Sequence, residues 1–550
     1  MLPDYQLFIA AGTLLLTQVT QTSASVIVTG PRVDPNAPSV PPRRSIVDFY
    51  ATGGPQWDLY IQALGAMQAA DATDPESYFQ ISGIHGKPFA EYDGTGPMNT
   101  SGWAGYCPHM EALFLPWHRP YVALFEQTLV SHARKIAVQY PEEHRSKYIE
   151  AADTLRSPFW DWATDRAVPQ ATVPQTLTIN VSEDGRLEAR IVENPLYTFK
   201  FPQAVLEGHF GEFDHEKRTQ VYRCNQLFMS YPETANANIR AKNYKQSLYD
   251  SFTRSTDFRQ FATMDSTGNS LEAIHGSIHW DAACQGQFLT VEFTGFDPLF
   301  MMHHTNVDRL WAYWQVMHPD QQLFSGEYLS KPRWGTPENT TITTKSPLQP
   351  FRRTETEFHT SETVQSIHDL GYSYPGLEFR SRNWDEMRAE VTRIINGLQP
   401  QLSSLGTRQA NGEPDDGRVM STRYFAHLTV ELSQVERPCS IEVSMNGSYS
   451  GNLVLMSMPE FGVAHGEIPL DSVHNLLQGK SSSVVLDTLE SWLDVEIMKI
   501  DGSTMALADV PSLGVQIEEV QVAAPRSDTE LPQYSHSRIF GIRLGRKTTN

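Results

Sequence analysis

The stretches SLEAIHGSIHW at residues 270–280 and FDPLFMMHHTNVDRLW at residues 296–311 decide the fold of this chain. In the first, His275 and His279 are four residues apart, so in a helix both imidazoles project from one face. In the second, a histidine pair at 303–304 precedes apolar residues at helical spacing. Because neutral imidazole is the commonest protein ligand for copper and zinc, these two helices predict a metal site.

Only one imidazole of the adjacent pair can face the centre of such a site, because neighbouring residues on a helix point in different directions. His304 stands four residues before Asp308 and shares a helical face with Trp311, while Arg309 points elsewhere. We therefore expect His304, and not His303, to be the metal ligand.

A second histidine cluster lies upstream, in HGKPF and GYCPHMEALFLPWHRPY, and contains His85, His109 and His118. Apolar spacing predicts a long helix over 111–138 that carries the last of them. A lone histidine is usually a packed core residue. An HxxxH pair alone is weak evidence for a paired-metal site, because metalloproteases also use this spacing. Six histidines in two groups indicate a paired-metal site, in which three imidazoles hold each ion and leave one position open.

The length of 550 residues favours two domains. The composition changes after about residue 385, and the stretch 396–418 is polar with Gly and Pro, as in a linker. Beyond it, apolar and polar residues alternate in short runs. We therefore expect a mainly α catalytic domain at 26–385, with a four-helix bundle core and long loops. A linker at 386–418 and a β-rich, sandwich-like domain at 419–550 should follow it.

The formal net charge of −21 argues against nucleic acid or an anionic membrane as a partner. No later stretch is apolar enough to span a membrane. Residues 1–25 resemble a secretory signal, although Asp4 and the lack of Lys or Arg leave a retained N-terminus open. We expect the secretory pathway, or otherwise the cytoplasm. Four N-x-S/T glycosylation acceptors agree with secretion: Asn99, Asn180, Asn339 and Asn446.

Four cysteines are present: Cys107, Cys224, Cys284 and Cys439. They have no CxxC spacing and are too few for a disulfide framework, so one or two bridges stay open.

Together the histidine motifs resemble the two copper signatures of the tyrosinase, catechol oxidase and hemocyanin family, the type-3 dicopper proteins. Fungal tyrosinases in particular match at HG-P-F, GYC-H, PWHRPY, SLE-IH-IH, FDP-F and HHTNVDR, and the likeness covers roughly residues 45–375. The resemblance implies two copper ions, one held by His85, His109 and His118 and the other by His275, His279 and His304.

The same resemblance implies roles for neighbouring residues. A thioether would join Cys107 to the ring of His109, unless Cys107 is a buried free thiol. Glu272 would orient a water near the metal pair, or else is an ordinary helix glutamate. Phe300 matches the aromatic that stacks over the site. Gly276 stands where members that hydroxylate monophenols often carry Asn or Asp, which tilts the expected activity toward catechols.

Two further features follow from the likeness. The Tyr-x-Tyr motif at 372–374 would close the catalytic domain, and Arg43 or Arg44 could stack on it by a cation–π contact. The β-rich tail resembles the domain that shields the site in latent fungal enzymes, with Phe461 as a candidate for a residue that plugs the pocket.

The resemblance implies an oxidase that converts o-diphenols to o-quinones with O2, in pigment or secondary-metabolite formation, and leaves hydroxylation of monophenols open. Its partners would be a small aromatic substrate and O2; the oligomeric state stays open. A third function, an oxygen carrier like hemocyanin, is disfavoured because carriers assemble many similar units.

Departures from the family pattern keep a non-redox function open. WDAACQGQFLTVEFTG follows His279 where fungal tyrosinases usually carry a Gly-rich segment, and Met301 and Met302 replace an aromatic–Leu pair. The cyclopenases also resemble tyrosinases and convert cyclopenin-type benzodiazepinediones to viridicatin-type quinolones. Three histidines with one open position also suit zinc as a Lewis acid, so a zinc-dependent lyase is the alternative.

Overall fold

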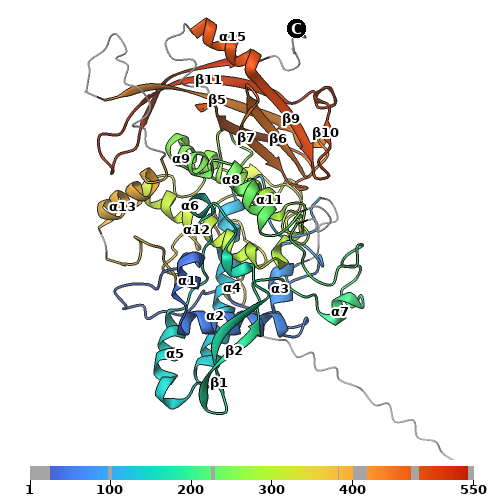
Figure 1. Ribbon diagram of the computed structural model, residues 1–550, viewed down its shortest axis with the longest axis vertical. Coiled ribbons are helices and arrows are strands. Elements are labelled where there is room, and N and C mark those ends of the chain that lie inside the picture. The colour runs from blue at the N-terminus through green and yellow to red at the C-terminus, as the bar shows by residue number, and fades with distance from the viewer. Residues whose placement is uncertain are drawn as a thin grey trace, which may run out of the picture.

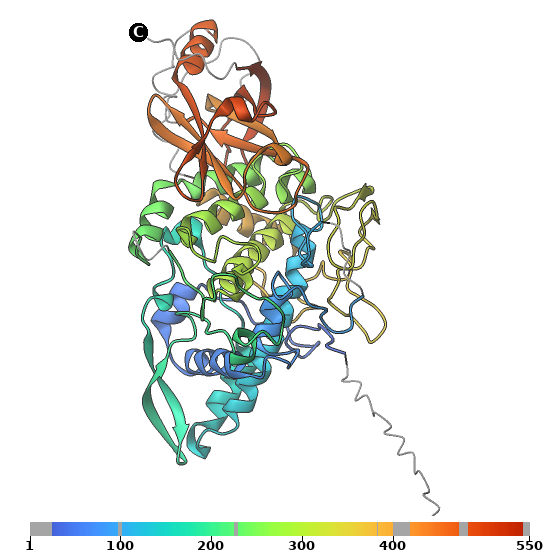
Figure 2. The same cartoon turned by 90° about the vertical axis from the view of Figure 1, so that its right-hand side faces the viewer.

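A helical part and a domain of antiparallel strands make up the chain, and the strands sit on one end of the helical part (Figures 1 and 2). The computed structural model describes residues 25–96, 102–224, 229–381, 383–399, 418–471 and 482–542. The prediction of a mainly helical core followed by a β-rich C-terminal part is confirmed. Of the helices in these ranges, none is both long and apolar enough to cross a membrane.

The helical part contains many helices and two short hairpins. The helices are α1 (Ile46–Thr52), α2 (Pro55–Ala69), α3 (Tyr78–Gly83), α4 (Phe114–Ala137), α5 (Glu142–Thr154), α6 (Trp162–Asp165), α7 (Gln203–Leu206), α8 (Glu233–Ala241), α9 (Tyr244–Arg254), α10 (Phe258–Ala262), α11 (Leu271–Ala283), α12 (Leu299–Met317) and α13 (Trp384–Asn396). The hairpins pair β1 (Thr176–Glu183) with β2 (Arg186–Glu193) and β3 (Tyr328–Leu329) with β4 (Thr341–Ile342).

Helices α4 and α12 form the centre of this part because they are buried on nearly every side. A helix enclosed all round belongs to the core of a protein and not to its surface. Helix α4 packs against both α2 and α12. Helix α11 begins beside them, where Ser270 Oγ caps its first turn by accepting from Ala273 N at 3.2 Å.

The carboxylate of Asp308 joins separate segments of the helical part. It accepts hydrogen bonds from Arg119 Nε at 2.5 Å and Arg43 Nη1 at 3.0 Å. The hydroxyls of Tyr372 and Tyr374 donate to it at 2.6 and 2.7 Å. Burial alone would raise the pKa of Asp308, but the two guanidinium groups outweigh burial and hold it below its usual value. Arg43 also lies 3.4 Å over the Tyr372 ring, which is the expected cation–π contact.

The C-terminal part is a sandwich of two four-stranded antiparallel sheets, ordered β10–β9–β6–β7 and β12–β11–β5–β8. The strands are β5 (Met420–Glu431), β6 (Cys439–Met445), β7 (Ser448–Leu455), β8 (Val463–Pro469), β9 (Leu493–Lys499), β10 (Thr504–Met505), β11 (Gly514–Ala523) and β12 (Gln533–Gly541). Ile441 of one sheet and Leu428 and Ile517 of the other share a buried core, as aligned sheets do. Helix α15 (Ser482–Trp492) lies outside the sheets (Figure 1).

The segment expected as a linker at 386–418 begins as helix. Helix α13 packs against α12 and buries Val391 and Ile395, so the helical part extends beyond residue 385. The polar text that suggested a linker at this point covers one solvent-facing side of an amphipathic helix. Residues 400–417, and residues 1–24 with nearly all of the expected signal sequence, lie outside the described residues.

We expect Asp308→Asn to lower the free energy of unfolding by about 3–5 kcal/mol at pH 7, because it leaves the buried guanidinium of Arg119 without its carboxylate, while Arg43 keeps its ion pair with Glu126. The pKa of Asp308 is depressed in the folded state. Its stabilising effect is therefore present above the unfolded pKa of about 3.9 and is lost as the pH falls through the folded pKa. Chemical denaturation of both proteins between pH 3 and 7 should show the difference shrink with acidity.

Glu183→Gln is the matched control for this measurement. Glu183 pairs with Arg190 in an exposed hairpin, where an ion pair contributes little. We expect a change of no more than about 0.5 kcal/mol. Equal effects of the two substitutions would contradict the role given to Asp308.

Candidate metal centre

Three imidazoles from the first half of the chain form a nearly equilateral triangle. His85 follows α3, His109 lies in the loop before α4, and His118 is in the second turn of α4. The ring centroid of His85 lies 5.6 Å from that of His109 and 5.7 Å from that of His118. The centroids of His109 and His118 lie 5.6 Å apart. Three rings that share one ion at about 2.0–2.1 Å from each nitrogen would have centroids about 5.5 Å apart.

A second set of imidazoles comes from α11 and α12. His275 and His279 project from one face of α11, as their spacing predicts, and their Nε2 atoms lie 3.0 Å apart. The ring of His304 on α12 is 4.9 Å from His275 and 5.9 Å from His279. Two nitrogens that bind one tetrahedral ion lie about 3.3 Å apart, so this set can also converge on a single metal.

The two trios are neighbours. The rings of His118 and His304 stack at 4.4 Å, and those of His109 and His275 are 6.0 Å apart. The six histidines that the sequence predicts as ligands therefore come together, although they lie in four separate stretches of the chain. The arrangement can hold two ions close enough to act on one small molecule.

His304 is the member of its pair that lies between the trios. Its ring contacts His118 and His85 of the first trio. His303 instead stacks on His275 at 5.0 Å and contacts the ring of Trp160, although one of its nitrogens also lies within 4.8 Å of nitrogens of His275, His279 and His304. This geometry favours His304 as the ligand and places His303 in the packing around the second trio.

Backbone carbonyl groups orient four of the rings through Nδ1 and so leave Nε2 for a metal. The pairs are His85 with Val291 O at 3.1 Å, His118 with Phe114 O at 2.7 Å, His275 with Glu272 O at 3.3 Å and His279 with Phe288 O at 2.7 Å. A carbonyl can only accept, so each Nδ1 carries the proton. The buried Nε2 atoms of His85 and His118 have no hydrogen-bond partner among the described residues. Such carbonyl partners are typical of metal-binding histidines.

Burial lowers the pKa of all six imidazoles, because a charged ring is costly away from water. The pKa falls to about 3 for His118 and about 4 for His279. These rings are therefore neutral near pH 7, the form in which imidazole binds a metal. The donor set fits copper or zinc equally well.

Cys107 is a buried free cysteine beside the first trio. Its Sγ donates to the carbonyl of His85 at 3.2 Å, and its sulfur and the ring nitrogens of His85 and His109 can lie within 4.8 Å of one another. Burial raises the pKa of the Cys107 thiol. The thioether to His109 stays a prediction.

Phe300 lies among the histidines, one turn before His304. Its ring packs at 4.1 Å on His304 and at 4.9 Å on His85. Phe114, which the sequence analysis did not single out, packs in the same way on His118 at 4.9 Å and His275 at 5.0 Å. These two aromatic rings restrict the tilt of ligands in both trios.

Both carboxylate oxygens of Glu272 accept hydrogen bonds from protein donors. One oxygen accepts from Met110 N at 2.7 Å; the other accepts from Thr263 Oγ1 at 2.9 Å and Met264 N at 3.0 Å. Burial raises its pKa to about 7, against the effect of these donors. Met110 follows His109 directly, so this carboxylate holds the loop of one histidine to the helix of another. The water-orienting role stays a prediction.

Strand β7 of the C-terminal domain packs against α11, the helix that carries His275 and His279. A Cβ added to Gly276 would lie 3.6 Å from the carbonyl oxygen of Val454, in ordinary contact. Val454, Met456 and Met458 are buried in the core of the helical part. Phe461 is 42% exposed, so the suggestion that it plugs the pocket is wrong. It lies in the loop after β7, whereas Val454 of that strand lies beside Gly276 of α11.

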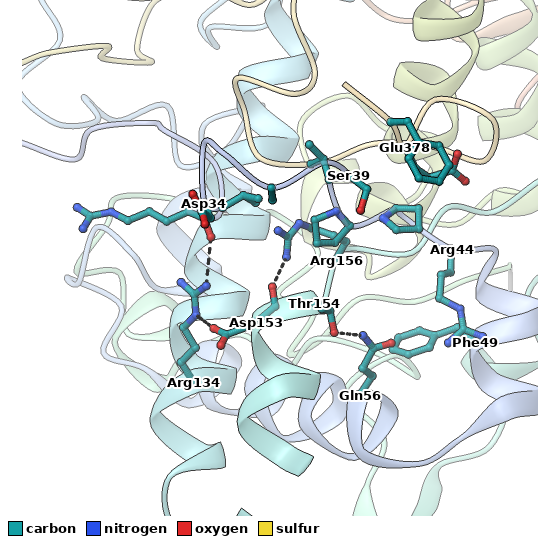
Figure 3. Close-up of a pocket in the computed structure, with 17 residues that line it drawn as sticks. Asp34, Ser39, Arg44, Phe49, Gln56, Arg134, Asp153, Thr154, Arg156 and Glu378 are labelled. Carbon is teal, nitrogen blue, oxygen red and sulfur yellow. Dashed lines mark hydrogen bonds and ion pairs between the residues drawn. The ribbon is translucent and has the colours of Figure 1, made fainter. Parts of the chain in front are cut away.

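The open cavity drawn in Figure 3 lies elsewhere. Its volume is about 890 Å³, and Arg44, Phe49, Arg134 and Arg156 are among its lining residues. None of the six histidines lines it. The six histidines are at most 6% exposed, so their rings are almost entirely buried.

Fold and site together define a class of protein with two adjacent three-histidine metal sites in a helical core. The family described as the common central domain of tyrosinase matches residues 75–317. A tyrosinase of Podospora anserina is 32% identical over 406 residues, which are 68% of this chain and 69% of that protein. Polyphenol oxidase 3 of Agaricus bisporus is 30% identical over 367 residues, 61% of each chain.

A solved structure of recombinant mushroom tyrosinase has the same fold, with a TM-score of 0.79 at 22% identity over 94% of this chain and 98% of that one. A crystal structure of an apo-protyrosinase from Aspergillus oryzae gives a TM-score of 0.70 at 19% identity, over 94% and 98%. This chain belongs to the tyrosinase family, of fungal type, as its motifs predict.

We expect His304→Gln to reduce bound copper from two ions per chain to about one, because the second trio loses a ligand that lies between the two sites. His303→Gln, the matched control on the same helix, should retain both ions. Elemental analysis of purified, copper-reconstituted proteins makes the comparison. Loss of an ion from the His303 variant alone would reverse the assignment.

Proposed function

We propose that this chain is a dicopper oxidase that converts o-diphenols to o-quinones with O2. The observation that carries the proposal is the 4.4 Å separation of the His118 and His304 rings, which brings two imidazole trios side by side. A bound copper pair supplies the redox chemistry, in which two diphenols lose two electrons and two protons each while one O2 becomes two molecules of water.

The protein's own contribution is orientation and exclusion of water. Backbone carbonyls hold the rings of His118 and His279 with Nε2 directed inward. Phe114 and Phe300 pack against the ligand rings and supply an apolar wall for an aromatic substrate. Since Glu272 is occupied by protein donors, we assign it to holding the loop of His109 in place.

Gly276 supports diphenols over monophenols as substrates. Glycine offers no carboxylate or amide that could help remove the proton of a phenol, whereas a catechol loses its protons more readily. The space beside Gly276 is bordered by Val454 of the C-terminal domain. We propose pigment or secondary-metabolite formation as the pathway, since o-quinones are reactive precursors of coloured products.

Copper and zinc give different outcomes at the same ligands, so metal reconstitution tests the proposal. Full-length protein loaded with copper or zinc is mixed with 4-tert-butylcatechol, and quinone absorbance and O2 uptake are followed. We expect quinone and O2 consumption only with copper, and none from copper-loaded His304→Gln.

A copper-loaded protein that yields no quinone from any catechol would refute the oxidase. Turnover of a cyclopenin-type substrate by the zinc form would then identify the lyase, and reversible O2 uptake without quinone would identify a carrier. Each reaction is also run on the Asp250→Asn, Arg254→Gln double variant, in which the C-terminal domain should limit access to the centre less.

We also propose that the C-terminal domain limits access to the centre. Ion pairs from α9 attach it to the helical part: Asp250 contacts Arg423 at 2.5 Å, and Arg254 contacts Glu467 at 2.6 Å and Glu518 at 2.5 Å. These pairs are largely buried, which makes them costly to break.

We expect the Asp250→Asn, Arg254→Gln double variant to oxidise catechol roughly 10-fold faster or more, because loss of a buried pair worth about 3 kcal/mol shifts an opening equilibrium about 100-fold. Initial rates per bound copper are the measurement. Arg190→Gln, which removes an exposed pair, is the control and should leave the rate unchanged. An unchanged rate in the double variant would contradict the covering role.

Secretion is proposed on the strength of a disulfide between Cys224 and Cys284, since such bonds persist in oxidising compartments. Two of the glycosylation acceptors, Asn339 and Asn446, are exposed. Asn180 instead uses its side chain to contact Asp58 at 3.2 Å, and Asn99 lies outside the described residues.

A further inference from the structure

Two consecutive residues reach the ends of both helices that carry the second trio. Cys224 is cross-linked to Cys284, the first residue after α11. Arg223 forms a buried ion pair with Asp297 at 2.6 Å. Asp297 Oδ1 also accepts from Leu299 N, the first residue of α12, at 2.9 Å. One short segment therefore fixes the end of α11 and the start of α12.

The backbone around the cross-link is packed closely. Cys224 N and Gly286 N both donate to the carbonyl of Ala283, at 2.9 and 2.7 Å, and Gln287 N donates to Tyr222 O at 3.0 Å. A Cβ on Gly286 would lie only 2.5 Å from Tyr222 O, so only glycine allows this approach. The two segments cannot slide past one another while these contacts and the disulfide are intact.

The loop that begins at Cys284 supplies acceptors to one ligand of each trio. Phe288 O takes the Nδ1–H of His279 at 2.7 Å, and Val291 O takes that of His85 at 3.1 Å. The path of this loop therefore sets the tilt of an imidazole in both metal sites.

We infer that Arg223 and the Cys224–Cys284 disulfide are a positioning clamp for the metal centre, acting through this loop on His279 and His85. The inference rests on the proposed role of the imidazoles as metal ligands. It also gives a function to the stretch at 280–295, in which this chain departs from the family pattern and which contains Cys284.

The backbone supports a positioning role for the cysteines. Cys284 has φ of 36° and Cys224 has φ of 60°, both in the left-handed region that favours glycine. The residue that follows a helix in this conformation is usually glycine. Cysteine at both points is explained by the cross-link and not by the local conformation.

The test compares metal affinity in full-length variants. Cys224→Ala with Cys284→Ala removes the cross-link without leaving a lone thiol, and Cys224→Ala with Cys284→Gly also relieves the left-handed backbone. Cys439→Ala removes a buried thiol of the C-terminal domain and is the matched control. Affinities for copper and for zinc are measured by competition with a chelator, well below the Tm of each variant.

We expect both double variants to bind metal roughly 10- to 100-fold more weakly, the loss typical when partners of metal ligands are disturbed, and Cys439→Ala to match the wild type. Unchanged affinity with a lowered Tm would make the disulfide merely structural and overturn the clamp. If the wild type itself failed to bind two ions, the proposed function and not the clamp would be at fault.

A second measurement uses only the wild type, in case the variants do not fold. Linkage is reciprocal, so a clamp that favours metal binding must itself be stabilised by bound metal. Zinc-loaded and metal-free protein are brought to equilibrium in glutathione redox buffers of graded ratio, and the fraction of the disulfide that is reduced to two thiols is measured. We expect the zinc-loaded protein to need a more reducing buffer for half-reduction; equal midpoints would contradict the clamp.

Discussion

The ion pair between Arg119 and Asp308 sets the spacing between the two halves of the metal centre. Arg119 follows His118 on α4, and Asp308 lies one turn after His304 on α12, so this contact and the 4.4 Å contact of the two rings are neighbours. Arg43 binds the same carboxylate and also Glu126, so two guanidinium groups and two carboxylates balance one another in a buried place. Displacing either helix would leave a buried charge without its partner, which is far more costly than moving an apolar contact.

Burial also prepares the imidazoles for a metal. Burial keeps the rings neutral by lowering their pKa. In His118 and His279 the Nδ1–H donates to a backbone carbonyl, so this buried polar group is not left without a hydrogen bond. The unpartnered Nε2 atoms of His85 and His118 are polar groups left without a bond among the described residues, a cost that a bound ion would remove. The C-terminal sheet adds to this isolation by placing Val454 over the face of α11.

Much of the site could be predicted because it depends on local spacing. The HxxxH pair places His275 and His279 on one face of α11, and the two helices predicted in the stretches 270–280 and 296–311 are observed as α11 and α12. The alternation of apolar and polar residues after residue 419 predicted the strands of the C-terminal domain in the same way. The boundary near 386 was misjudged because α13 is amphipathic and reads as polar on its exposed side.

The sequence by itself determined the ligand types, their grouping in two trios, and the helical and β-rich parts, since these follow from periodicity within short windows. Only the tertiary structure decided that Cys224 pairs with Cys284, that carbonyls of residues 288 and 291 orient two histidines, and that Val454 of β7 packs beside α11 while Phe461 is exposed. Every backbone carbonyl is chemically alike and any two cysteines can pair, so such contacts depend on the path of the chain and leave no pattern in the residues.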